Sequence, residues 1–421
     1  MPIRGGYAGK MIWVDLSKEK IIITDTPEDL ALNYIGGRGF GAKILWDQLP
    51  VGADPLSPDN ILIFATGPLT GLSLPSSGKL DVITKSPLTG GYGDSNVGGV
   101  FSAKLKFAGF DAIVVKGRSE KPVYLYIEDG KAELRDASDL WGLGTFETED
   151  ELKKRHGEDT AVLSIGPAGE NMVKFAAIIH GKGRAAGRTG VGAVMGSKRL
   201  KAVAVIGRKP VPVADPEALR KAAAEAYMFI RKAEGYDMWM RQGTMFVVKW
   251  GNDLSILPTR NFQSGVFEEA DGISGDLMEK LKIDQRGCYG CNMQCGNVIK
   301  IGKGPEAGKE SELDYENIAM LGSNIGIGDM DYASTLNRLC DDYGLDTIST
   351  GNVIGFAMEA YEKGLLTDDM TNGLKIRFGD HEVALKLVEM IAYRKGVGDL
   401  LAEGVKRVAE KLGDDAKHFA M

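Results

Sequence analysis

The chain has 421 residues, of which 43% are hydrophobic and 26% charged, and its formal net charge is −7. This is the composition of an ordinary globular protein, long enough for two or three domains of about 150 residues. The acidic balance argues against nucleic acid as the main partner. No stretch approaches the roughly 20 apolar residues that span a bilayer, and the first residues contain no apolar signal core. We therefore expect a cytoplasmic protein that binds neither nucleic acid nor a membrane.

Strand-forming segments separated by glycine and proline turns dominate the chain as far as residue 210. They are rich in Val, Ile and Tyr, which favour strands. The expected strands are Lys10–Asp15, Lys20–Thr24, Ile61–Ala65, Leu80–Thr84, Asp111–Gly117, Pro122–Glu128, Ala161–Ile165 and Lys201–Ile206. Helices are expected at Glu28–Tyr34, Gly41–Gln48, Phe101–Phe107 and Thr145–His156, the last with acidic residues early and basic residues late.

The character of the sequence changes after residue 210. Asp215 is a good N-cap and Pro216 suits a first helical turn, so a helix is expected at Pro216–Gly235. Helical periodicity also marks Asp331–Tyr343, Thr350–Gly364, Glu382–Lys395 and Gly398–Gly413. The sequence therefore predicts an α+β protein. A sheet-rich domain spans residues 1–210, and a mainly α-helical domain that carries a cysteine loop spans residues 211–421.

Three of the four cysteines, Cys288, Cys291 and Cys295, form the pattern C-x2-C-x3-C. Thiolates are soft ligands that suit iron–sulfur clusters and zinc, and Gly290 permits the backbone turn that convergent sulfurs require. A zinc ribbon normally has two C-x2-C pairs, and the sequence has no second pair. We therefore expect a [4Fe–4S] cluster held by three nearby cysteines and one distant cysteine, with three ordinary thiols as the alternative. The remaining cysteine, Cys340, lies on a predicted helix with apolar neighbours, where a packed thiol is the commoner finding.

Three glycine-rich segments are suited to approach a polyanion. Gly36–Gly41 follows a predicted helix rather than the strand that a dinucleotide fingerprint needs, so NAD is not expected, and a turn between helices is the alternative. Gly93–Gly99 leads into a predicted helix whose free amides attract phosphate, and Asn96 can offer an oxygen to Mg2+. In Gly181–Gly192, arginines alternate with small residues, so guanidinium groups can pair with phosphate or pterin oxygens. A solvated basic loop is the alternative for this third segment.

Several motifs together resemble the aldehyde:ferredoxin oxidoreductase family. They are Gly67-Pro68-Leu69-Thr70-Gly71, Thr84-Lys85-Ser86-Pro87-Leu88-Thr89-Gly90, Leu105–Asp111, Ile165–Asn171, Gly192–Lys198, the cysteine loop and Asp341–Ser349. The resemblance runs through nearly the whole chain. It implies a tungsten (or molybdenum) atom held by two pterins above a sheet-built base domain, with a [4Fe–4S] cluster nearby. It also implies oxidation of an aldehyde to a carboxylate, with electrons passed to ferredoxin.

The resemblance also implies roles for individual residues. Asn96 and Ala185 match the positions that hold the Mg2+ bridging the two pterin phosphates. The positions that match pterin contacts are Gly98, Arg184, Gly187, Arg188, Asp341 and Leu345. Lys79 stands where the family often has an arginine that links pterin and cluster. Glu316 matches a glutamate near the metal that can relay a proton, with a buried ion pair as the alternative.

Members of the family continue into a further helical domain, whereas this sequence ends at Met421. That domain carries a second D-x-x-G-L motif ending in the fourth cluster cysteine, and a histidine near the substrate. We therefore expect an oxidoreductase that lacks the usual C-terminal domain, or one completed by a second chain or by a homo-oligomer. The alternatives are a non-catalytic cofactor-binding or electron-transfer fragment and a relative that acts on acids or acyl thioesters.

Overall fold

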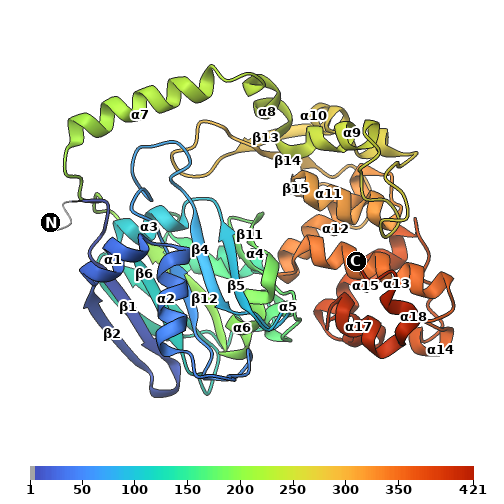
Figure 1. Ribbon diagram of the computed structural model, residues 1–421, viewed down its shortest axis with the longest axis horizontal. Helices are drawn as coiled ribbons and strands as arrows, with labels where there is room; N and C mark the ends of the chain where they lie inside the picture. Colours follow the sequence, from blue (N-terminus) through green and yellow to red (C-terminus); the bar gives the residue numbers. More distant parts are fainter. Residues whose placement is uncertain (1–4) are drawn as a thin grey trace. The chain divides into compact units, whose positions relative to one another are not determined.

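The computed structural model describes residues 5–421, which divide into two compact units (Figure 1). The first, called here the sheet unit, comprises residues 5–172, Ala176–Ala233 and Cys288–Asn292. The second, called the helical unit, comprises Val173–Phe175, Glu234–Gly287 and Met293–Met421. The cysteine loop is therefore divided, because Cys288 and Cys291 belong to the sheet unit and Cys295 belongs to the helical unit.

Two six-stranded sheets build the sheet unit, with the orders β2-β1-β6-β3-β4-β5 and β11-β10-β9-β12-β7-β8. Their strands are β1 Lys10–Asp15, β2 Lys20–Asp25, β3 Leu62–Ala65, β4 Leu80–Lys85, β5 Tyr92–Val97, β6 Ala112–Lys116, β7 Val123–Glu128, β8 Lys131–Asp136, β9 Ala161–Ser164, β10 Ile178–His180, β11 Arg184–Ala186 and β12 Leu200–Ile206. Neighbouring strands are antiparallel except for the pairs β1–β6 and β7–β12, which are parallel.

The helices of the sheet unit are α1 Glu28–Tyr34, α2 Arg38–Gln48, α3 Phe101–Phe107, α4 Thr145–His156, α5 Pro167–Glu170, α6 Val191–Ser197 and α7 Pro216–Arg231, with short 3-10 turns at Leu16–Lys18 and Arg188–Gly190. Of these, α1, α2, α3, α4 and α6 contribute side chains to the apolar cores on the faces of the sheets. Alternate side chains of a strand point to opposite faces. Ile12 and Val14 of β1 therefore join a core shared by both sheets and by α3 and α6, whereas Met11 packs with α1 and α2. Helix α4 packs on the other face of the second sheet.

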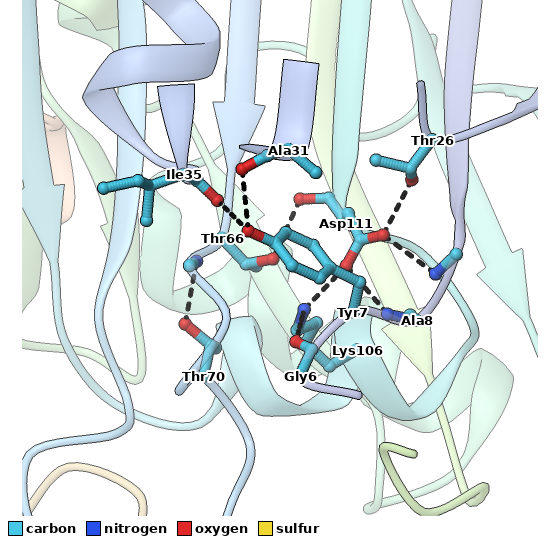
Figure 2. A network of polar contacts seen from close by, with 12 residues as sticks. Gly6, Tyr7, Ala8, Thr26, Ala31, Ile35, Thr66, Thr70, Lys106 and Asp111 are labelled. Carbon is cyan, nitrogen blue, oxygen red and sulfur yellow. Dashed lines mark hydrogen bonds and ion pairs between the residues drawn. The ribbon is translucent and has the colours of Figure 1, made fainter. Parts of the chain in front are cut away.

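A buried ion pair fixes residues 6–9 beside the first sheet (Figure 2). The Lys106 and Asp111 side chains are fully buried, with Nζ 2.6 Å from Oδ1. Asp111 also accepts hydrogen bonds from the backbone N–H groups of Ala8 and Gly9, both at 2.8 Å, and from Thr26 Oγ1 at 2.7 Å. Every partner the carboxylate needs is therefore supplied inside the protein, which is the condition under which a buried charge is tolerated.

The helical unit contains one small antiparallel sheet, ordered β13-β14-β15, with strands Lys282–Arg286, Gly296–Lys300 and Glu310–Leu313. Its helices are α8 Tyr236–Gln242, α9 Phe246–Asp253, α10 Gly275–Leu281, α11 Tyr315–Leu321, α12 Met330–Tyr343, α13 Thr347–Glu362, α14 Asp368–Thr371, α15 His381–Ala392, α16 Val397–Leu401, α17 Val405–Leu412 and α18 Asp414–Lys417, with 3-10 turns at Gly243–Met245, Ala270–Ile273 and Ser323–Ile325. Side chains from α9, α10, α11, α12, β14 and β15 form one of its cores.

The predicted α+β class is confirmed, and most expected elements are present within a few residues of their predicted bounds. The prediction of a single helix at Gly398–Gly413 is wrong. The helix is interrupted between α16 and α17, where Gly404 adopts φ +85°. A left-handed glycine ends a helix and cannot continue it. The domain boundary near residue 210 stays a prediction. None of the helices within residues 5–421 combines the length and the apolar character that crossing a membrane requires.

Candidate functional site

The first and second glycine-rich segments meet through Arg38, at the start of α2. Its guanidinium forms an ion pair with Asp94, and Nη2 donates to Asn96 Oδ1 at 3.3 Å. Asn96 lies on β5 opposite Asp81 of β4, and its amide donates to the Asp81 carboxylate. Burial raises the pKa of Asp81 despite the nearby Arg38. The side-chain oxygen of Asn96, the predicted Mg2+ ligand, therefore already faces a positive charge.

The third glycine-rich segment lies against the second within the sheet unit. Arg184 and Ala185 belong to β11, which contacts β5. Ser95 Oγ of β5 donates to the carbonyl of Arg188, and Ser86 Oγ donates to the carbonyl of Thr189 at 2.7 Å. Gly187 and Arg188 therefore follow β11 in a turn that is fastened to the neighbouring segment, so the solvated-loop alternative is not supported.

Gly98 is the point at which several predicted site residues converge. A β-carbon on Gly98 would lie 2.6 Å from Cys288 Sγ, 3.6 Å from Lys79 Nζ and 3.8 Å from Arg184 Cδ. Only a residue without a side chain fits there. The sheet unit therefore gathers a thiol, an ammonium group and an arginine side chain, from three distant parts of the sequence, around one glycine.

The first half of the cysteine loop is docked on the sheet unit by its backbone. Tyr289 N–H donates to the carbonyl of Gly99 at 2.9 Å, and the carbonyl of Gly290 accepts from Tyr227 Oη of α7 at 2.7 Å. Gly290 has φ +68°, and a β-carbon there would meet Leu74 O at 2.4 Å. Ser76 Oγ lies 3.9 Å from Cys291 Sγ. The loop is therefore held at Tyr289 and Gly290, between Cys288 and Cys291.

The other two cysteines belong to the helical unit, and all four cysteines are thiols. Cys295 directly precedes β14, and its carbonyl accepts from Asn297 Nδ2 at 3.0 Å. Cys340 of α12 is completely buried, and this burial raises its pKa, as for a thiol packed in a core. Within residues 5–421 no group of three or more His, Cys, Asp or Glu side chains is arranged to hold a metal ion. A [4Fe–4S] cluster differs from a single ion, because each of its irons takes its own thiolate.

Asp341 and Leu345 flank the C-terminal end of α12 in the helical unit. Gly344, with φ +72°, caps the helix and turns the chain between them. Asp341 is 4% exposed, and burial raises its pKa well above the usual range, with the Glu312 carboxylate as the next cause. Burial therefore favours the neutral form of the Asp341 carboxyl, which can both donate and accept hydrogen bonds.

Glu316 lies in the first turn of α11 with its side chain exposed. The alternative of a buried ion pair at this position is therefore not supported.

Three residues of these surroundings were not predicted from the sequence. Arg38 stands between glycines, as the arginines of the third segment do, and that likeness is a signal that could have identified it. His180 and Glu312 are buried, at 4% and 3% exposure. Nothing in the sequence around either residue marks it as buried, so only the tertiary structure reveals them.

Two domain models of one sequence family match the chain. Aldehyde ferredoxin oxidoreductase, N-terminal domain, matches residues 11–207, and Aldehyde ferredoxin oxidoreductase, domains 2 & 3, matches residues 221–421. The tungsten-containing aldehyde ferredoxin oxidoreductase of Thermococcus kodakarensis is 47% identical over 412 residues, which cover 97% of this chain and 68% of the relative. The aliphatic sulfonate oxidoreductase, WOR-like subunit, of Pyrococcus furiosus is 35% identical over 427 residues, with the same two coverages.

A solved structure also matches the fold. It is the active site complex BamBC of benzoyl coenzyme A reductase with 1,5 dienoyl-CoA, to which this chain is 33% identical with a TM-score of 0.88. The match covers 99% of this chain and 65% of the other chain. The chain thus spans about two thirds of the length of the proteins it matches, which include tungsten-containing oxidoreductases. With both family domains matched in order, the chain belongs to the aldehyde ferredoxin oxidoreductase family.

Proposed function

We propose that the chain binds a tungsten bis-pterin cofactor and a [4Fe–4S] cluster and oxidises aldehydes to carboxylates, with ferredoxin as electron acceptor. The convergence of Lys79, Arg184 and Cys288 around Gly98 carries this proposal, because it brings groups expected to contact a pterin next to a group expected to bind iron. The names of the relatives support tungsten, aldehyde and ferredoxin.

The residues of the sheet unit fit a phosphorylated pterin. Arg184 and Arg188 offer guanidinium groups that pair with phosphate in a planar, two-pronged geometry. Gly98 and Gly187 leave room for the backbone to approach. Asn96 Oδ1 would bind Mg2+ together with the Ala185 carbonyl, and oxygen donors of this kind are the ligands that Mg2+ prefers. In that state Arg38 would exchange its contact with Asn96 for a phosphate oxygen.

The thiol donors fit an iron–sulfur cluster. Cys288, Cys291 and Cys295 would supply three soft thiolate ligands, and the fully buried Cys340 is left as a core residue. Lys79 would lie between cluster and pterin and donate hydrogen bonds to either. When bound, the metal groups would supply the redox chemistry at the aldehyde carbon and pass the electrons on singly.

The protein's own part in the reaction is positioning and proton transfer. Aldehyde and water yield a carboxylate, three protons and two electrons. The exposed Glu316 carboxylate would accept a proton from the water at Oε and release it to solvent. Asp341 and Leu345 would contact a pterin, with the Asp341 carboxyl as a hydrogen-bond partner.

The remaining inferences about partners rest on the sequence. We propose that the enzyme is cytoplasmic and passes electrons to ferredoxin, a separate protein. We also propose that a homo-oligomer or a second chain supplies further site residues. The residues proposed here come from both units.

A second candidate function is reduction of an acyl thioester or acid. The likeness to the benzoyl coenzyme A reductase complex at 33% identity favours it, since that complex is described with a dienoyl-CoA. The two candidate functions would share the sheet-built domain that binds the cofactor, and only the substrate would differ.

The test is anaerobic purification with tungstate and iron, followed by metal analysis and a viologen-reduction assay. The proposal expects tungsten and iron in the protein and aldehyde-dependent viologen reduction. Activity with an acyl thioester in place of aldehydes would select the second candidate. Protein that is folded, supplied with both metals and still free of tungsten and iron would contradict both.

A further inference from the structure

His180, at the end of β10, is buried with both ring nitrogens engaged by backbone. Nδ1 lies 2.8 Å from the carbonyl of Val162, and Nε2 lies 3.2 Å from the backbone nitrogen of Val100. A carbonyl only accepts and a backbone N–H only donates, so Nδ1 carries the proton and Nε2 accepts. Burial lowers the pKa of His180, in agreement with a neutral ring.

The segment that His180 holds, Gly98–Val100, joins β5 to α3 and has two close neighbours. On one side, a β-carbon on Gly99 would lie 2.4 Å from His180 Cδ2. On the other side, the Gly99 carbonyl accepts from Tyr289 N–H at 2.9 Å, and Gly98 adjoins Cys288 Sγ. A continuous chain of contacts therefore runs from the imidazole through three backbone residues to the cysteine loop.

We infer that His180 is a positioning residue that fixes Cys288, through the hydrogen bond from Val100 N–H to Nε2 and the backbone of Gly98 and Gly99. Its acceptor nitrogen sets where Gly99 presents its carbonyl to Tyr289, and hence where Cys288 stands beside Lys79 and Arg184. The inference rests on the proposed role of Cys288 as a cluster ligand, while the hydrogen-bond chain itself does not depend on a cluster.

A purely structural role for His180 has to be separated from this one. The ring also fills space beside Phe101, with centroids 6.1 Å apart and the planes at 72°. Its Nδ1–H group also donates a hydrogen bond to the carbonyl of Val162. A residue that only filled the core or bound Val162 would not need an acceptor at the Nε2 position.

Two substitutions of similar size distinguish the positioning role of His180 from a purely structural one. His180→Gln can place an amide oxygen near the Nε2 position and retain the hydrogen bond from Val100. His180→Asn can place an amide nitrogen near the Nδ1 position and retain only the bond to Val162. Each variant loses one buried hydrogen bond, so their costs in stability are matched.

The readout is the rate at which iodoacetamide alkylates Cys288 in the full chain without metals, followed by peptide mass spectrometry. Cys340, which is 0% exposed, serves as an internal reference for folding. We expect His180→Asn to speed alkylation of Cys288 about fivefold, the factor that loss of one hydrogen bond gives to a local opening equilibrium. His180→Gln is expected to stay near the wild-type rate, and Cys340 is expected to stay protected in both.

A second variant removes the same hydrogen bond by changing its donor. Val100→Pro deletes the N–H group, and it also shifts the backbone, because Val100 has φ −117° whereas proline prefers about −65°. It should speed alkylation of Cys288, and adding His180→Asn should make the double variant no faster than Val100→Pro alone. If His180→Asn exposes Cys340, Val100→Pro remains as the test, because an unchanged rate in it would contradict the inference.

In the iron-loaded protein, His180→Asn should also change the electron paramagnetic resonance spectrum of the reduced cluster, and His180→Gln should not. Equal alkylation rates for folded Asn and Gln variants, or an unchanged rate in Val100→Pro, would overturn the inference. Wild-type protein that takes up no iron would instead count against the proposed function, and the alkylation rates would still judge the role of His180.

Discussion

Lys198 Nζ donates a hydrogen bond to the carbonyl of Asn60 at 2.5 Å, although the Lys198 side chain has no exposed surface. The carbonyl of Gly117 accepts from the same ammonium at 3.1 Å. Burial lowers the pKa of Lys198 to about 7, with the nearby Arg118 as the next cause. The two carbonyl oxygens accept hydrogen bonds from the Lys198 amine, but they carry no negative charge that would neutralise an ammonium group.

This lysine should make stability depend on pH. Between pH 7 and 10.5 the unfolded chain binds a proton at Lys198 that the native state does not, so the free energy of unfolding rises with pH. Below this window both states are protonated and the penalty is fully present. Relative to Lys198→Met, wild-type protein should gain about 1.4 kcal/mol per pH unit in the window. Urea unfolding of both proteins at several pH values measures this, and parallel pH profiles would contradict it.

The Lys106–Asp111 pair should be costly to break. Lys106→Met leaves the buried Asp111 carboxylate without its cation and should lower the free energy of unfolding by about 3–5 kcal/mol. Lys104→Met is the control, since Lys104 pairs with Asp159, whose side chain is 61% exposed, and should cost less than about 1 kcal/mol. Chemical denaturation gives both values. Similar losses in the two variants would show that burial of the pair does not matter.

The cysteines should separate into ligands and core. Cys291→Ser should abolish the visible iron–sulfur absorption of anaerobically prepared protein, because it removes a thiolate from the cluster. Cys340→Ala should retain that absorption, since the Cys340 thiol is completely buried in α12. Iron content per chain is the second measurement. A normal spectrum in Cys291→Ser, or its loss in a folded Cys340→Ala variant, would reverse the assignment.

The enzyme should not tolerate a side chain at position 98. Gly98→Ala places a β-carbon 2.6 Å from Cys288 Sγ and should lower activity about ten- to a hundredfold, the usual effect of displacing groups around a metal site. Gly91→Ala is the control, because its nearest neighbour would be 3.8 Å away. Viologen reduction and iron content measure the effect. Full activity in Gly98→Ala would show that the site tolerates a side chain there.

The protonation of Asp341 can be tested by an isosteric change. Because burial raises the pKa of Asp341 well above its usual range and so favours the neutral carboxyl, the neutral Asp341→Asn variant should retain the proposed pterin. Asp341→Ala leaves the buried partners without a hydrogen bond and should lose most of it. Fluorescence of pterin released by oxidation gives the content. Loss of pterin in Asp341→Asn equal to that in Asp341→Ala would indicate that the charged carboxylate is required.

The sequence was most informative where local pattern decides the structure. The strand Lys10–Asp15 and the helix Thr145–His156 have their predicted bounds, because a short apolar run between charged residues marks the strand and the charge distribution marks the helix. Strand β5 was not predicted, since Gly93, Asp94 and Asn96 disfavour strands and are held in one only by pairing with β4. The glycine segments and the cysteines were identified, but their convergence around Gly98 depends on contacts between distant parts of the chain.

The division of the chain between units has a consequence for biosynthesis. Residues 288–292 complete the sheet unit, although more than fifty residues of the other unit, Glu234–Gly287, precede them. During translation, domains tend to fold as they emerge. The two sheets can therefore form well before the ribosome delivers Cys288 and Cys291, and these thiols then arrive at a surface that already exists. The proposed iron–sulfur cluster would accordingly be assembled late in the maturation of the protein.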